Sequence, residues 1–151
     1  MNYRWLLFSF RGRLNRAPFW WITLASLIVV PAVAWFLMDL ATALPVLAIG
    51  IGAVLYIPFL WGNLAIAGKR LHDRNRSVGW LVVFYLVPSI LSEFGTRLAE
   101  PESVFVPGAV ATLIGAVLGL WGLIEIGFLR GTPGANRFGP DPLGRSAVRV
   151  D

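Results

Sequence analysis

The chain consists of long apolar stretches separated by short polar connections. Three stretches of 20, 25 and 25 residues contain one charged residue between them, Glu125, and they cover Phe19–Met38, Ala43–Ala67 and Val104–Phe128. As α-helices rising about 1.5 Å per residue, all three are long enough to cross a hydrocarbon core of about 30 Å. A fourth stretch, Val78–Phe94, has 17 residues and is more polar at its far end. The pattern therefore predicts four transmembrane helices, of which the third carries the weakest signal.

The composition supports a membrane protein, with 57% apolar and 14% charged residues. Soluble domains are about half apolar and about a quarter charged. The first stretch exceeds the usual core of a secretory signal, about 7–15 residues, so we expect it to be retained as a span. The chain has no cysteine, which excludes disulfide and thiolate chemistry. The sequence thus predicts an all-α integral membrane protein.

Lysine and arginine residues fall almost entirely on one side of the predicted helices. Twelve of the 13 lie before the first stretch, between the second and third, or after the fourth, and Arg97 alone lies between the third and fourth. The positive-inside rule assigns the side with the twelve to the cytoplasm. We therefore expect a single membrane domain, 1–151, folded as an up-down bundle of four helices with both termini cytoplasmic and a structured cytoplasmic tail at 129–151. The net charge of +5 then reflects topology and anionic lipid headgroups rather than nucleic-acid binding.

Small residues recur within the second and fourth stretches. Gly115 and Gly119 are four residues apart, a spacing that lets two helix backbones approach closely. Packing within the chain is the simpler interpretation, and a homo-oligomer interface is the alternative.

The segment before the first stretch mixes aromatic residues with arginine. Phe8 and Phe10 suit the headgroup layer, and Arg11, Arg13 and Arg16 would extend to lipid phosphates there. Asn15 is placed to cap the first helix. We expect this segment to act as a membrane anchor, with a specific lipid or partner site as the alternative.

The most polar part of the chain is residues 69–80, KRLHDRNRSVGW, which contains the only histidine and the only lysine. His72 and Asp73 are adjacent and do not share a helix face, and one histidine without cysteines does not supply a zinc ligand set. We expect Lys69 and Arg70 to end the second helix at the membrane interface and Asp73 or Ser77 to cap the third. A catalytic pair of His72 and Asp73 is the alternative.

Glu125 is the only acidic residue within the three long stretches, and an ionisable group inside a span is a functional candidate. It lies about one turn from the cytoplasmic end of its stretch, where it would pair with Lys69 or Arg70 or reach headgroup water. The alternative is a transport pathway, for which Asn63 is the other polar residue of note.

The tail segment GTPGANRFGPDPLG, residues 131–144, contains four glycines and three prolines. This composition forbids a regular helix and predicts a series of tight turns. A disordered linker would not require Phe138. We expect a folded cap that docks on the 69–77 loop, with Arg70 and Asp141 as an energetically coupled pair.

Three motifs follow one another along the chain. The first has the pattern FxGRxxRxxFW and consists of Phe10, Gly12, Arg13, Arg16, Phe19 and Trp20. The second is an RLHD loop followed by a serine and a tryptophan, and consists of Arg70, Leu71, His72, Asp73, Ser77 and Trp80. The third has the pattern GTxGxNxFGPDP and consists of Gly131, Thr132, Gly134, Asn136, Phe138, Gly139, Pro140, Asp141 and Pro142. Together they resemble the motifs of the domain-of-unknown-function 805 family of bacterial inner-membrane proteins, although the family usually has Ser-Gly-Trp-Trp where this chain has Ser-Val-Gly-Trp.

The resemblance implies a small multi-pass protein of the bacterial cytoplasmic membrane, and it implies no catalytic residue, cofactor or metal. We expect a non-enzymatic binding or regulatory protein whose three motifs build one cytoplasmic-face platform for a protein partner or an anionic lipid. Two alternatives remain: a small transporter or channel using Glu125, and a membrane enzyme centred on His72 and Asp73.

Overall fold

The computed structural model describes residues 3–99 and 105–145. Within these ranges every regular element is helical, and the only β pairing is an isolated bridge between Asn136 and Gly139. The all-α prediction is thereby confirmed. The expected start of the fourth span at Val104 and the end of the predicted tail, 146–151, lie outside the described residues.

The first two spans form a tight helical hairpin. Helix α2 (Arg16–Ala43) and helix α3 (Pro45–Asp73) are separated by Leu44 alone. The side chain of Asn15 accepts a hydrogen bond from the N–H of Ala17, so the predicted N-cap is confirmed. Both helices run past the predicted stretches at the same end of the hairpin, since α2 begins at Arg16 rather than Phe19 and α3 ends at Asp73 rather than Ala67.

The remaining helices form a second hairpin, and each contains a π-helical turn. Segment η1 (Val82–Leu86) leads into α4 (Val87–Ala99), while α5 (Phe105–Leu123) leads into η3 (Ile124–Phe128). Gly115 lies so close to α4 that an added Cβ would stand 3.0 Å from the carbonyl oxygen of Pro88. The prediction that small residues of the last span pack within the chain is therefore confirmed.

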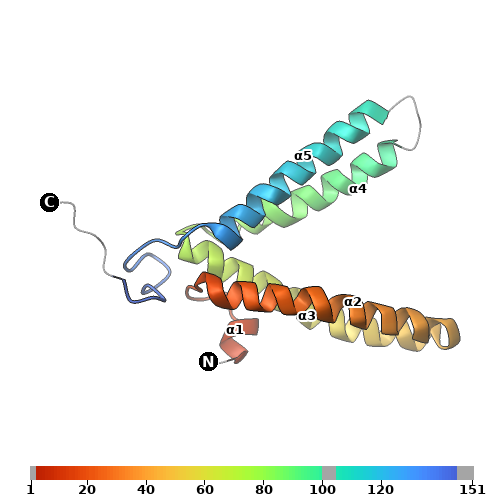
Figure 1. Ribbon diagram of the computed structural model, residues 1–151, viewed down its shortest axis with the longest axis horizontal. Helices are drawn as coiled ribbons and strands as arrows, with labels where there is room; N and C mark the ends of the chain where they lie inside the picture. Colours follow the sequence, from red (N-terminus) through yellow and green to blue (C-terminus); the bar gives the residue numbers. More distant parts are fainter. Residues whose placement is uncertain (1–2, 100–104, 146–151) are drawn as a thin grey trace.

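The two hairpins diverge from a shared end, as Figure 1 shows. Among the described residues, the helices of one hairpin contact those of the other through η3, which packs on α2 and α3. The expected single up-down bundle is therefore wrong, and the helices pair as two arms. The physical reason is that lipid tails solvate an apolar helix face as well as another helix does, so hydrophobicity alone does not force four spans together.

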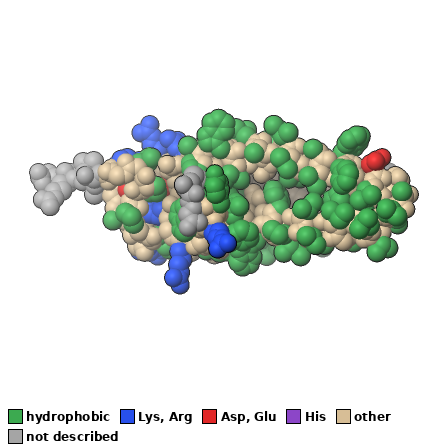
Figure 2. Space-filling view, turned by 90° about the horizontal axis from the view of Figure 1, so that it is seen from below, with side chains coloured by type: hydrophobic (Ala, Val, Ile, Leu, Met, Phe, Trp, Pro, Cys, Tyr) green, Lys and Arg blue, Asp and Glu red, His purple; other side chains and the backbone are tan. Residues whose placement is uncertain are grey.

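Three helices in the described part of the chain are long and apolar enough to cross a membrane: Arg16–Ala43, Pro45–Asp73 and Val106–Phe128. The predicted third span, Val78–Phe94, is not among them. Apolar side chains stay exposed along the helices, for example Trp35 and Val46, as expected of surfaces that face lipid. Figure 2 shows hydrophobic side chains along the helices and Lys and Arg side chains gathered at one end.

The buried core lies at that charged end rather than along the hairpins. Helix α1 (Tyr3–Phe8), which the sequence pattern did not predict, packs on α3 there. In α3, the buried positions other than Ala48 fall between Gly62 and Asp73. Leu6, Leu71 and Ile126 pack together in this core. The most tightly packed part of the protein therefore coincides with the segment that carries the polar motifs.

Candidate functional site

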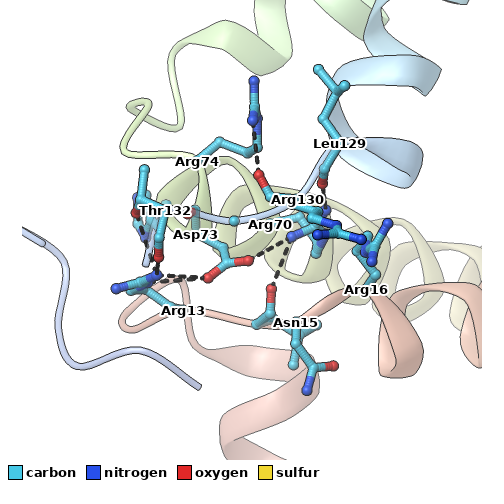
Figure 3. Close-up of polar contacts among 12 residues, drawn as sticks. Arg13, Asn15, Arg16, Arg70, Asp73, Arg74, Leu129, Arg130 and Thr132 are labelled. Carbon is cyan, nitrogen blue, oxygen red and sulfur yellow. Dashed lines mark hydrogen bonds and ion pairs between the residues drawn. The ribbon is translucent and has the colours of Figure 1, made fainter. Parts of the chain in front are cut away.

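Asp73 forms the centre of a buried ion-pair cluster that joins distant parts of the chain (Figure 3). One carboxylate oxygen, Oδ1, accepts from Arg13 Nη2 at 3.0 Å, and the other, Oδ2, accepts from Arg70 Nη1 at 2.8 Å. The side chains of all three residues are at most 3% exposed. Asp73 therefore does not cap the following helix as expected, because both of its oxygens are engaged by arginine.

Arg13 also holds the tail. Its Nη1 donates to the carbonyl oxygen of Gly134 at 2.6 Å, and its Nη2 donates to that of Thr132 at 2.6 Å. The expectation that Arg13 reaches lipid phosphate is wrong, since the side chain is buried between α3 and the tail. A guanidinium has five N–H donors in a planar fork, and here they join one carboxylate to several carbonyl oxygens.

Arg70 lies in the same cluster and is fully buried. Besides Asp73, it binds the carbonyl oxygens of Ile126 and Leu129, at 2.9 and 3.0 Å. These belong to the C-terminal end of the last helical segment, where carbonyl groups lack helical partners and carry partial negative charge. Arg70 thus ties the end of the second hairpin to the end of the first.

Lys69 performs a similar role for α1. Its Nζ donates to the carbonyl oxygens of Leu6 and Ser9, at 2.7 and 2.5 Å, and lies 5.2 Å from the centre of the Trp5 ring. Lys69 is fully buried. The sequence predicted that Lys69 and Arg70 end the second helix at the membrane interface; α3 instead continues to Asp73, and both side chains bind backbone carbonyls that would otherwise be unpaired in the core.

The tail docks on the end of α3, as the sequence indicated. The N–H of Thr132 donates to the carbonyl oxygen of Asp73 at 2.8 Å, and Asn136 Nδ2 donates to that of His72 at 2.9 Å. The tail backbone passes so close to α3 at Gly131 that only glycine fits, because a Cβ there would collide with the Asp73 carboxylate. The second and third motifs therefore form one folded cap.

His72 lies under this cap. Its ring stacks on that of Phe138, with centroids 3.8 Å apart and planes 7° apart. Its Nδ1 is 3.0 Å from the carbonyl oxygen of Gly12, a contact in which Nδ1 carries the proton. His72 therefore links the first and third motifs by packing and hydrogen bonding, and its neighbour Asp73 points to Arg13 and Arg70 instead.

Asp141 makes its contacts within the tail itself. It pairs with Arg145 at 2.8 Å and accepts a hydrogen bond from the N–H of Leu143. These hydrogen bonds, that from Arg145 foremost, lower the pKa of Asp141 from 3.8 to about 2. Asp141 thus pairs with Arg145, four residues away, rather than directly with Arg70, and the expected energetic coupling of Arg70 with Asp141 stays a prediction.

Glu125 is buried and paired with two arginines of the polar loop that follows α3, residues 74–79. Its Oε1 lies 3.0 Å from Arg74 Nη2 and 2.8 Å from Arg76 Nε. Neither Lys69 nor Arg70, the partners expected from the sequence, contacts it in the described structure. The π-helical turn η3 carries Glu125 to the side of α3 where the loop begins, a placement that sequence periodicity does not reveal.

The other motif residues support the same assembly. Phe10 packs on Gly68 and lies edge-on to Trp61, while Trp80 contacts the rings of Phe84 and Trp121. Ser77, in contrast, is exposed, and its carbonyl rather than its hydroxyl accepts from Trp80. The first motif contributes Phe19, which is buried, and Trp20, which donates to the carbonyl oxygen of Gly127.

The cluster is complete as a structural unit. No buried side-chain nitrogen or oxygen among the described residues lacks a hydrogen-bond partner. The described ranges also contain no group of three His, Cys, Asp or Glu residues able to hold a metal ion. Lys69, Arg74 and Arg76 belong to this assembly although they stand outside the three motifs, and their concentration within residues 69–76 was the signal that pointed to them.

Comparison with known proteins places this arrangement in a family. The chain is 34% identical to uncharacterized protein YiiR of Escherichia coli K12 over 139 residues, which cover 89% of this chain and 86% of YiiR. It is 30% identical over 135 residues to inner membrane protein YhaI of the same strain, covering 89% of this chain and 86% of YhaI, and 29% identical over 143 residues to inner membrane protein YhaH, covering 89% and 87%. No solved structure matches the chain. The family model described as "Protein of unknown function (DUF805)" matches residues 7–140, so this membrane protein belongs to the DUF805 family.

Proposed function

We propose that the protein is a non-enzymatic binding protein that spans the membrane four times and holds a rigid basic platform at the cytoplasmic face. The platform consists of the polar loop, residues 74–79, and the folded tail, residues 129–145. The buried cluster around Asp73 supports this proposal because it fixes the tail on the loop rather than leaving either one mobile. A preorganised surface loses less entropy on binding than a flexible one.

One observation carries the proposal: the acidic side chains described at this end are all ion-paired, whereas several arginines are exposed. Asp73, Glu125 and Asp141 each bind one or two arginines within the structure. Arg130 and Arg137 are exposed on the platform, and Arg4, Arg11 and Arg16 are exposed beside it at the same end. The platform therefore presents uncompensated positive charge, which attracts an acidic partner and accelerates its association.

The partner we propose is a protein with an acidic surface on the cytoplasmic side. Arg137 supports this choice, because its Nη2 donates to the carbonyl oxygen of Asn75 and its guanidinium lies over the Phe138 ring. These contacts hold an exposed charge at the junction of loop and tail. Anionic lipid alone is the other occupant consistent with a basic surface beside a membrane.

The contacts of the alternative candidate residues favour a binding role. His72 is stacked and hydrogen-bonded, Asp73 is saturated by two arginines, and Glu125 is paired with two more. A general base or a proton carrier must exchange protons with substrate or water. In the arrangement described here, these three groups serve the internal structure.

Site-specific photo-crosslinking in native membranes tests the proposal. A crosslinker at Ala135, which is exposed on the tail, should capture a discrete protein, and the Arg137→Glu change should abolish the adduct. A crosslinker at Thr96, exposed at the opposite end, is the control for non-specific membrane neighbours. Identical adducts at both positions, or an adduct at Ala135 that is insensitive to Arg137→Glu, would contradict the proposal. Lipid adducts alone would assign the surface to lipid.

A further inference from the structure

A groove of about 360 Å³ lies beside the platform, where the charged end meets the apolar helices. Its lining comes from the start of α2, the end of η3 and the tail, and includes Asn15, Arg16, Trp20, Phe128 and Leu143. These residues are far apart in sequence and come together because Arg16 and Trp20 bind the carbonyl oxygens of Phe128 and Gly127, each at 2.9 Å. The volume is within the range of small-molecule sites, about 300–1,000 Å³.

The mouth of the groove is cationic. Arg16 is exposed, and the one hydrogen bond that it makes within the described residues uses Nη1. A guanidinium has five N–H donors and binds phosphate oxygens through two of them at once. Among the described residues no carboxylate lines the groove, and Asp141, two residues from Leu143, is neutralised by Arg145. Arg16 therefore presents donors and positive charge that no described acidic group in the groove compensates.

The walls of the groove are apolar. The rings of Trp20 and Phe128 lie edge-on with centroids 5.0 Å apart, and the indole N–H of Trp20 is already bound to Gly127. Phe128 is 55% exposed and Leu143 is 57% exposed. Exposed aromatic residues at this level are typical of the membrane–water boundary. The neighbouring Trp21, 74% exposed at the start of the apolar run, indicates that this boundary lies at the groove.

A phosphate-binding charge directly above an apolar wall at the membrane boundary matches one class of ligand. We propose that the groove binds an acidic phospholipid, with its phosphate on Arg16 and its glycerol and upper acyl chain against Trp20, Phe128 and Leu143. A soluble acidic peptide would not require the lipid-facing aromatic wall, and free phosphate would use Arg16 alone. The site goes beyond the proposed protein-binding platform, because Arg16 and the aromatic wall hold the ligand rather than Arg137, and Leu143 alone of the groove residues named here belongs to the platform.

Lipid titration of the purified full-length chain tests this site. Native mass spectrometry in a neutral detergent would count retained phosphatidylglycerol, phosphatidylcholine and inorganic phosphate separately. We expect phosphatidylglycerol to bind preferentially, and Arg16→Gln to weaken that binding about tenfold, the loss of one charge-assisted contact. Arg97→Gln, which removes an exposed arginine at the opposite end, is the matched control and should leave binding unchanged.

Two further variants keep the test informative if Arg16→Gln disturbs folding. Arg16→Lys preserves the charge but removes the planar fork, so it should retain only part of the binding. Leu143→Asp changes an exposed side chain and places a carboxylate in the groove, so it should abolish binding of phosphatidylglycerol. Equal retention of phosphatidylcholine, or unchanged binding in Arg16→Gln and Leu143→Asp, would overturn the proposal. If inorganic phosphate displaces phosphatidylglycerol completely, the groove is a site for free phosphate. A failed crosslink at Ala135 would contradict the protein-binding platform without bearing on lipid binding in the groove.

Discussion

Arg13 and Asp73 stand 60 positions apart in sequence and form a buried ion pair, with Arg13 Nη2 3.0 Å from Asp73 Oδ1. Through Arg13 the pair reaches the carbonyl oxygens of Thr132 and Gly134, and through Asp73 it reaches Arg70. The pair therefore joins the first motif to the second, and Arg13 extends the connection to the third. Burying two charges is costly, so this pair defines which segments meet more than it adds stability.

Removing the shared carboxylate should be the most damaging change in the cluster. Asp73→Asn leaves two buried guanidiniums without their counter-ion, and loss of one partner from a buried pair costs about 3–5 kcal/mol of unfolding free energy. Arg13→Met should cost less, because Asp73 keeps Arg70. Reversible unfolding in mixed micelles measures both, with Glu93→Gln as the control, since its pair with Arg97 is exposed and worth at most about 1 kcal/mol. Equal effects of Asp73→Asn and Glu93→Gln would refute the cluster.

The close approach of the tail to α3 gives a second prediction. Gly131→Ala places a methyl group against the Asp73 carboxylate, so the tail must shift, at a cost of about 1–3 kcal/mol. Gly50→Ala is the matched control, because a Cβ at Gly50 meets nothing within 4 Å; it should change stability by about 1 kcal/mol or less. Limited proteolysis of the tail and thermal unfolding of both variants would measure the difference. A tail equally protected in both variants would argue against the docked arrangement.

The depressed pKa of Asp141, about 2 against an ordinary 3.8, predicts that the cap weakens in acid. Because the folded state holds the carboxylate ionised, its contribution to stability is present above about pH 4 and is lost as the pH falls towards 2. The chain has no cysteine, so a spin label at Leu143→Cys would report the mobility of the tail. The label should loosen between pH 4 and 2, and Asp141→Asn should loosen it already at pH 7. A label in Asp141→Asn as immobile as in the parent at pH 7 would disprove this role.

The proposed topology is tested by reporter fusions after residues 41, 75, 100 and 151. Fusions after 75 and 151 should report a cytoplasmic location, and fusions after 41 and 100 a periplasmic one, because the basic residues gather at the end that carries the loop and the tail. A periplasmic signal after residue 75 would invert the assignment. A cytoplasmic signal after residue 100 would show that Val78–Phe94 does not cross.

Much of the fold was predictable because it depends on local sequence. The apolar runs located the helices, Asn15 marked the start of α2, and the glycine and proline pattern of residues 131–144 indicated a folded tail. The docking of that tail on the 69–77 loop followed from their common side of the membrane. These inferences depend only on helix length, helix capping and the distribution of Lys and Arg between the two sides of the membrane.

The partners within the cluster were not predictable, because they depend on how the two hairpins meet. Arg70 and Asp73 are the exception, because they stand three residues apart on one helix face, where side chains meet. The pairs of Glu125 with Arg74 and Arg76, in contrast, require the π-helical turn and the contact of η3 with α3. Divergence of the hairpins is equally hidden, since apolar periodicity does not distinguish a face covered by lipid from one covered by a helix.

Hydrogen exchange tests whether the buried charges hold the tail as part of the folded core. In lipid nanodiscs, the hydrogen-bonded amides of the tail should exchange slowly in the parent protein; they belong to Thr132, which is bound to Asp73, and to Gly134, Asn136 and Gly139. They should exchange at least about tenfold faster in Asp73→Asn, while α5 stays protected in both. Exchange of this segment in the parent at the rate of an unstructured peptide would contradict the account.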